Sequence, residues 1–436
     1  MSSDRQEHET PSNEVLAPRT TKPEFGGTPG ALFVIISVTI TMYYLTFACN
    51  PTLGCDLTLP LQDPEGLVAY ARHYFLSSFV DTKGWALYFG CSNLALATGL
   101  VAFGACAAYV FVYGPENFTV LYKHWPGLLS AAVVNAFVQA VYVYAASFQG
   151  EKLLAEGGNT GNVIFDWFIG RELNPRIGLF DIKTFNELRP GLILWGLIDV
   201  SCACWQYTHF GYVSDSMWLV ILFHVWYTLD SLMHEENIFS QMDITTDGFG
   251  FMLSIGDLAW VPFVYSLQAR YLAFHPVDLG VVGVLAVLAV QCVGFYIFRV
   301  SNLEKNEFRQ GNNPKNLQFM TTSSGRKLLT SGWWGRCRHP NYLGDWIMGW
   351  AWCLPCGFNT PVPYFYVVYF ATLLVHRQMR DDEGCKKKYG SEYVIFVIVL
   401  TTTPFGSTVG IPMYVFVGVT NLQCKRVPYR IIPYIY

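Results

Sequence analysis

Long apolar runs separated by shorter polar segments dominate this chain. A helix that spans a membrane needs about 20 mostly apolar residues. Runs of that kind lie at 30–49, 84–113, 127–147, 189–207, 214–233, 247–268, 277–298, 342–360 and 361–377. A further apolar stretch, 394–418, is interrupted by Pro404 and Pro412. The pattern predicts an all-α fold in which these helices form a polytopic membrane bundle.

The composition favours the same class of protein. Of the 436 residues, 52% are hydrophobic and only 14% are charged, whereas a soluble globular chain carries about a quarter charged residues. The formal net charge of -4 gives no nucleic-acid signature. The 12 cysteines lie mostly within apolar runs, which is not the pattern of a secreted disulfide framework.

The polar start of the chain shows no cleavable signal peptide. We therefore expect a disordered tail over 1–29, and a first apolar helix that serves as the targeting signal. No internal repeat is visible, so the remaining residues, 30–436, are predicted to form a single polytopic domain.

Basic residues collect in two polar segments, 299–340 and 376–389. Cytoplasmic loops are enriched in Lys and Arg, so we expect both segments to face the cytosol, where reduced nicotinamide cofactors are made. Lys305 and Arg309 lie one helical turn apart, which puts two cations on one face. A bound phosphate would relieve their repulsion, but a basic stripe against lipid headgroups explains the pattern equally well.

Two polar blocks beside the C-terminal apolar runs could carry chemistry. In GWWGRCRHPNYLGDW, Pro340 sets a turn and Asn341 can cap the following helix, whose free amides would suit a pyrophosphate. Trp334 could stack on a flat ring, although interface anchoring is the commoner role. In HRQMRDDEGCKKKYG, Arg377 and Asp381 form either a plain ion pair or, in a cavity, a group that relays a proton.

Other signals are weaker. Asp247 and Asp257 lie at the edge of an apolar span and inside it, where acids are functional candidates, although pairing with Arg270 or His234 is an even alternative. No GxGxxG motif and no P-loop is present, which argues against a Rossmann domain. The CxxC spacing in WCLPCGF lies in an apolar run without companion ligands, so no metal site is expected.

The long blocks resemble the sterol reductase family of the endoplasmic reticulum, whose members reduce carbon–carbon double bonds of sterol intermediates with NADPH. The match runs from PRTTKPEFGG to VPYRIIPYIY. Its strongest blocks are GGNTGNVIFDWFIGRELNPR, MDITTDGFGFMLSIGDLAWVPFVYSLQARYL, GWWGRCRHPNYLGDW and HRQMRDDEGCKKKYG. The second block is similar to the branch that acts at C14–C15, and not to the Δ7 branch. Alternatives are Δ7 or C24(28) reduction, methyl transfer, and a non-catalytic sterol-binding membrane protein.

The resemblance implies about ten spans of roughly 20 residues each, with linked NADPH and sterol cavities in the C-terminal half, about 247–436. Carried over position by position, the NADPH contacts fall on Lys305, Arg309, Leu329, Trp334, Asn341, Tyr342, Asp381, Cys385, Lys388 and Tyr389, with Arg377 nearby. On the sterol side the family's tyrosine falls on Tyr227. We expect Tyr227 and Asp381 to supply and relay the proton, with Glu236 and Asp243 as further sterol-side candidates.

The segment 394–423 departs from the family pattern, because KYGSEY is followed there by an apolar stretch before CKRVPYRI. Valine codons begin with GT and a glutamine codon can end in AG, so we hypothesise a translated, retained intron that is dispensable or harmful. The expected location is the endoplasmic reticulum membrane, with multiple passes. Expected partners are the sterol substrate, drawn from the bilayer, and membrane lipids, with no nucleic acid; association with other sterol-pathway enzymes is left open.

Overall fold

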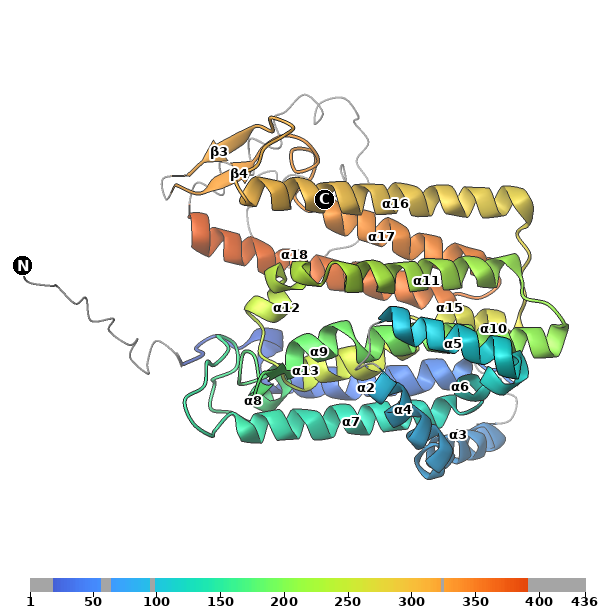
Figure 1. Cartoon of the computed structure of the whole chain (residues 1–436). Coiled ribbons are helices and arrows are strands. Elements are labelled where there is room, and N and C mark those ends of the chain that lie inside the picture. Colours follow the sequence, from blue (N-terminus) through green and yellow to red (C-terminus); the bar gives the residue numbers. More distant parts are fainter. Residues whose placement is uncertain (1–18, 56–63, 95–98, 323–324, 391–436) are drawn as a thin grey trace, which may run out of the picture. The chain divides into compact units, whose positions relative to one another are not determined.

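The computed structural model describes residues 19–55, 64–94, 99–322 and 325–390. The predicted span at 394–418 and the insert at 394–423 lie outside these residues. The chain divides into two compact units, 1–278 and 279–436, and Figure 1 shows the helices of each. The second unit begins later than residue 247, where the sequence placed the start of the cofactor-binding half.

The first unit contains most of the helices and one short hairpin. Its main elements are α2 (Thr28–Ala48), α3 (Pro64–Val80), α4 (Thr82–Leu94), α5 (Gly99–Tyr113), α7 (Trp125–Ala146), α8 (Val163–Ile169), β1 (Arg176–Ile177), β2 (Phe180–Asp181), α9 (Ile182–Leu188), α10 (Pro190–Phe210), α11 (Asp215–Met233), α12 (Met242–Thr245), α13 (Phe251–Ile255), α14 (Val261–Val264) and α15 (Leu267–Phe274). The span formed by α9 and α10 is the most buried of the candidate membrane helices, since 78% of its most apolar 18-residue stretch is buried inside the protein. It is therefore the centre of this unit, against which α11, α14 and α15 pack.

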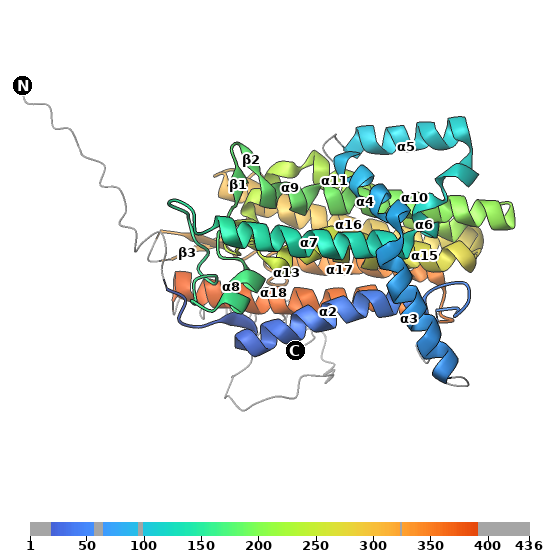
Figure 2. The same ribbon diagram turned by 90° about the horizontal axis from the view of Figure 1, so that it is seen from below.

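The second unit is smaller, and its described residues contain three long helices. They are α16 (Gly280–Arg309), α17 (Pro340–Cys353) and α18 (Phe365–Tyr389), with a hairpin of β3 (Phe319–Thr321) and β4 (Lys327–Leu329) between the first two. Met320 pairs with Leu328 in the antiparallel ladder. Helix α17 packs on α16 along one face and on α18 along another, and Figure 2 gives the view from below.

Five described helices are long and apolar enough to cross a membrane: Thr28–Ala48, Trp125–Ala146, Ile182–Phe210, Asp215–Met233 and Gly280–Arg309. They coincide with predicted spans and confirm a polytopic helical membrane protein. The predicted total of about ten spans stays a prediction. The predicted run at 247–268 is broken into α13, a π-helical turn at Gly256–Trp260, and α14. The two hairpins were not part of the all-α prediction.

Residues 19–29, which the sequence assigned to the tail, are held in place. The Thr20 hydroxyl donates to the carbonyl of Glu156 at 2.6 Å, and the Thr20 amide donates to that of Asn159 at 3.0 Å. Phe25 meets the ring of Phe168 edge to face at 5.8 Å. These contacts give the segment a fixed path into α2.

Two of the long sequence blocks, which are far apart along the chain, are in direct backbone contact at glycine residues. Gly170, with φ of 98°, ends α8, and a Cβ there would lie 2.5 Å from the backbone nitrogen of Gly250. Real Cβ atoms essentially never lie that close to another atom, so only a glycine fits here. The positive φ of Gly170 is a second reason, because residues with a side chain rarely adopt it. The GGNTG block and the DGFG block are thereby joined backbone to backbone.

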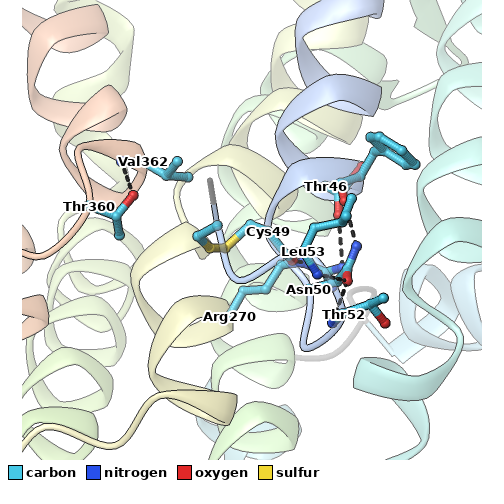
Figure 3. Close-up of a disulfide and its surroundings, with 10 residues drawn as sticks. Thr46, Cys49, Asn50, Thr52, Leu53, Arg270, Thr360 and Val362 are labelled. Carbon is cyan, nitrogen blue, oxygen red and sulfur yellow. Dashed lines mark hydrogen bonds between the residues drawn. A yellow bond between two sulfur atoms is a disulfide. The ribbon is translucent and has the colours of Figure 1, made fainter. Parts of the chain in front are cut away.

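The end of α2 is fixed by a disulfide and an arginine, as Figure 3 shows. Cys49 is bonded to Cys55, and the Asn50 side chain accepts hydrogen bonds from the amides of Thr52 and Leu53 at 2.8 and 3.0 Å. The buried Arg270 donates to the Cys49 carbonyl at 2.7 Å and to that of Thr46 at 3.1 Å. Arg270 therefore binds backbone carbonyl groups at the end of α2, and does not pair with Asp247 or Asp257, which the sequence had left as an alternative.

In the second unit, α16 and α17 come into backbone contact at Gly294 and Gly344. A Cβ on Gly344 would lie 2.7 Å from the Gly294 carbonyl oxygen and against the amide nitrogen of Phe298. Small residues allow membrane helices to approach in this way, and this contact fixes α17 against α16.

We predict that Gly344→Ala lowers the free energy of unfolding by about 1–3 kcal/mol, because the added methyl group overpacks the crossing. The measurement is thermal unfolding of the purified protein in detergent. Gly384→Ala on α18, where nothing lies within 4 Å of a Cβ, is the matched control and should be neutral or stabilising. Equal unfolding temperatures for the two variants would contradict the crossing.

Candidate cofactor and sterol sites

The C-terminal end of α16 carries an ordered ammonium–indole pair. Lys305 Nζ lies 4.4 Å from the centre of the Trp334 ring. The Trp334 indole donates to the Ser301 carbonyl at 2.8 Å and is only 9% exposed. The indole is thus held by the helix that carries the lysine, and its cation–π contact keeps the ammonium in one place.

Glu304 ties the following loop to α16. Its carboxylate accepts from the Trp333 amide at 3.1 Å and from Lys315 Nζ at 3.1 Å. Because Glu304 is buried, these bonds satisfy a carboxylate that would otherwise be costly to desolvate. They draw the basic segment after α16 back onto the helix end.

Asp381 on α18 meets the start of α17. The Tyr342 hydroxyl donates to its Oδ2 at 2.9 Å, and His339 Nδ1 lies 3.8 Å from the same oxygen. The His339 and Tyr342 rings stack at 4.9 Å. Burial, and then the positive charges of Lys305 and Arg338, lower the pKa of His339 to about 3. The imidazole is therefore neutral at cytosolic pH, and its contact with Asp381 is not an ion pair.

The neighbouring acid, Asp382, has a different partner. Arg338 Nη1 donates to both carboxylate oxygens, at 2.7 and 2.9 Å, and both residues are buried. The pair fixes α18 against the loop that enters α17. Sequence reasoning missed this ion pair. The signal was the second aspartate of RDDEG, which needs a cation when it is buried, and Arg338 is a candidate in the neighbouring RHPNY block.

The hairpin and the end of α18 contribute to one apolar cluster. Met320 and Leu328 of the hairpin, and Cys385 and Tyr389 of α18, are its partly buried members, and burial raises the pKa of the Cys385 thiol. Leu329 on β4 is also buried. These predicted cofactor contacts are therefore apolar packing positions, which a cofactor would meet with its flat or aliphatic parts.

The second unit brings most of the predicted cofactor residues together. The charges of Arg309, Asp381, Cys385 and Lys388 all act on Lys305. Arg309 and Lys388 are exposed. Within the described residues, none of the three cations Lys305, Arg309 and Lys388 forms an ion pair with a carboxylate.

One sequence prediction at this site is wrong. The residue that caps α17 is His339, with Pro340 in the first turn, and no side chain makes a cap hydrogen bond. Asn341 is therefore not the cap, and its Oδ1 has no hydrogen-bond partner among the described atoms. Arg377 lies one turn before Asp381 on α18.

The sterol-side candidates lie on the first unit. Tyr227 is on α11, with its ring 6.2 Å from that of Trp195. Glu236 is exposed in the 3-10 helix Glu235–Ser240, whereas Asp243 on α12 is buried. The structure gives Asp243 an enclosed position and Glu236 an open one.

A buried lysine, which sequence reasoning missed, fixes the segment that carries Asp243. Lys183 is fully buried, and its ammonium donates to the carbonyls of Leu173, Ile244 and Asp247, at 3.1, 3.2 and 2.5 Å. The three bonds use all three donors of the ammonium. His234 Nδ1 lies 3.5 Å from Asp230 Oδ1, an acid that sequence reasoning did not pair with it.

We predict that His339→Gln changes how stability depends on pH. Between about 6.5, the ordinary histidine pKa, and about 3, the unfolded chain binds a proton that the folded chain does not. The free energy of unfolding therefore falls as the pH drops below about 6.5, with this one proton contributing about 1.4 kcal/mol per unit. The variant should fall less steeply in unfolding experiments across that window.

The exposed His73, replaced by Gln, is the matched control for that measurement. Parallel curves for the wild type and His339→Gln would contradict a buried neutral imidazole beside Asp381.

Known proteins match this chain over most of its length. The sequence model of the "Ergosterol biosynthesis ERG4/ERG24 family" matches residues 83–398. The delta(14)-sterol reductase of Schizosaccharomyces pombe is 46% identical, with 95% of this chain and 97% of the relative aligned. The Saccharomyces cerevisiae enzyme is 38% identical over 97% and 99%, and the mouse delta(14)-sterol reductase TM7SF2 is 46% identical over 71% and 70%. The chain therefore belongs to the ERG4/ERG24 family of sterol reductases.

Proposed function

We propose that this membrane protein is a delta(14)-sterol reductase, which saturates the C14–C15 double bond of a sterol intermediate with NADPH. One observation carries the cofactor side of the proposal: the positive charges of Arg309 and Lys388 both act on Lys305, with Asp381 and Cys385 opposing them, and none of these three cations forms an ion pair with a carboxylate in the described chain. Like charges repel at such range, so an anionic ligand would stabilise them. The relatives named delta(14)-sterol reductase support the choice of reaction.

The residues around Lys305 suit a phosphorylated nicotinamide cofactor. Lys305, Arg309 and Lys388 would hold its phosphates through charge-assisted hydrogen bonds. The Trp334 indole and the packed side chains of Leu329, Cys385 and Tyr389 would line its flat and aliphatic parts. A bound reduced nicotinamide supplies the hydride.

The chemistry requires a proton as well as a hydride. An unactivated double bond does not accept hydride directly, so C15 is protonated first and C14 becomes a tertiary cation. Hydride transfer to C14 then completes the reduction, with one proton and one hydride added across the bond. Within the enzyme, Tyr227 is the proposed donor to C15, and Asp381 the proposed group that replaces its proton.

The surroundings of Asp381 suit this role. The Tyr342 hydroxyl holds its carboxylate at 2.9 Å, and the neutral His339 ring beside it adds no competing charge. A phenol is a weak acid, so the proposed donor needs such a partner to recover its proton after each turnover. Exclusion of water by the surrounding helices would protect the cation.

The proposed location is the endoplasmic reticulum membrane, with both basic segments on the cytosolic side. The sterol would enter from the bilayer, and the cofactor from the cytosol. Reduction at Δ7 or C24(28) and non-catalytic sterol binding remain alternatives, and product analysis separates all three from the proposal.

The first test is activity. Membranes that contain the protein, given NADPH and a Δ14-sterol, should form the C14–C15-saturated product detected by mass spectrometry. Asp381→Asn keeps the size of the side chain and removes its basicity, so turnover should fall at least about 100-fold. Glu383→Gln, an exposed acid on the same helix, should leave turnover unchanged. Near-normal activity of Asp381→Asn would remove Asp381 from the mechanism, and no product from the wild type would refute the reaction.

The second test concerns the cofactor phosphate. Replacing Lys305 and Arg309 together with Ala should weaken NADPH more than NADH, because each charge-assisted bond to the extra phosphate is worth about 1.5–3 kcal/mol. Lys386→Ala, an exposed cation on α18, is the control for general electrostatics. The measurement is the KM for each cofactor at saturating sterol, and an equal loss for both cofactors would show that this pair does not bind the extra phosphate.

A further inference from the structure

A buried aspartate–histidine pair lies at the centre of the first unit and takes no part in the proposed reaction. His224 Nδ1 on α11 is 2.8 Å from Asp199 Oδ2 on α10, and both side chains are 0% exposed. Both helices are candidate membrane spans. Ionisable groups in such places cost several kcal/mol and are usually retained for function.

The pair continues into the aromatic residues next to it. The Trp195 indole N–H donates to the same His224 Nδ1 at 3.1 Å, and the two rings lie 4.5 Å apart. The Trp195 ring meets Tyr227 edge to face at 6.2 Å and Tyr265 at 5.4 Å. An unbroken series of contacts therefore leads from Asp199 through His224 and Trp195 to Tyr227, all within one unit.

The hydrogen bonds of this series depend on a single atom. An indole N–H can only donate, so Trp195 is anchored only while His224 Nδ1 accepts. Asp199 Oδ2 lies 2.8 Å from the same Nδ1, so the aspartate and the indole meet at this one ring nitrogen. Dispersion contacts alone would let the indole shift or rotate, whereas the N–H bond to His224 fixes its orientation.

We propose that Asp199 and His224 are positioning residues for the sterol-side tyrosine: they lock the Trp195 indole, whose face in turn sets the direction of the Tyr227 side chain. The inference rests on the proposed role of Tyr227 as proton donor. A donor must lie within hydrogen-bond reach of the atom that it protonates, and a displacement of about 1 Å can cost on the order of 100-fold in rate. Neither residue of the pair touches the substrate.

The test is a double-mutant cycle between His224 and Tyr227. His224→Phe keeps a ring of similar size and removes the acceptor, so kcat for the sterol should fall about ten-fold or more, with the KM for NADPH unchanged. In a Tyr227→Phe background the same substitution should cost little further, because the hydroxyl that it misplaces is already absent. A purely structural role would lower kcat by the same factor in both backgrounds, and that result overturns the proposal.

Two more variants keep the test decisive. Trp195→Phe removes the N–H donor and leaves the side chains of Asp199 and His224 unchanged. If His224→Phe does not fold, Trp195→Phe takes its place in the same double-mutant cycle with Tyr227→Phe. Asp199→Asn combined with His224→Asn supplies neutral amides that can reproduce both hydrogen bonds, so it should recover most of the kcat lost in His224→Phe. Failure of that recovery would count against positioning.

The outcomes also separate this inference from the proposed function. If Tyr227→Phe alone leaves turnover unchanged, the proposed donor is wrong and the inference fails with it. If Tyr227→Phe slows turnover but His224→Phe does not, only the positioning role is wrong.

Discussion

An ionisable side chain among membrane helices needs an opposite charge or a set of carbonyl groups close by, and this requirement organises both units. Lys183 binds three backbone carbonyls, Arg270 binds those that end α2, and Arg338 is paired with Asp382. Against this background, the cations around Lys305 differ because no carboxylate pairs with them in the described chain. The same rule that explains the structural charges therefore motivates the proposal of an anion site at these cations.

Close backbone crossings make these pairs possible. Gly170 lies against Gly248 and Gly250, and Gly344 against Gly294, so that helices and loops approach within a distance that side chains would forbid. Lys183 can reach the carbonyls of Ile244 and Asp247 only because this segment is held there. The long sequence blocks that contain these glycines are thus constrained by packing.

The two units carry different parts of the proposed reaction. The second unit holds the proposed cofactor cations, the Trp334 indole and Asp381. Lys305, Trp334 and Asp381 each contact a residue of another element. The first unit holds Tyr227, behind which the buried Asp199–His224 pair and Trp195 form a rigid support. The proposed proton donor and the proposed cofactor residues thereby come from separate packing units, each of which can be tested by substitutions within it.

The sequence by itself determined the class and the family, because apolar runs of spanning length and long specific motifs can be recognised without knowledge of the fold. It also supplied the proposed cofactor residues on the second unit. It did not determine the cap of α17, which is His339 and not Asn341, since the choice depends on how the loop enters the helix. The partners of Asp381, Asp382, Lys183 and His224 come from distant segments, so no spacing along the chain reveals them. The neutral state of His339 likewise depends on burial and on Lys305 and Arg338, and packing alone decides these.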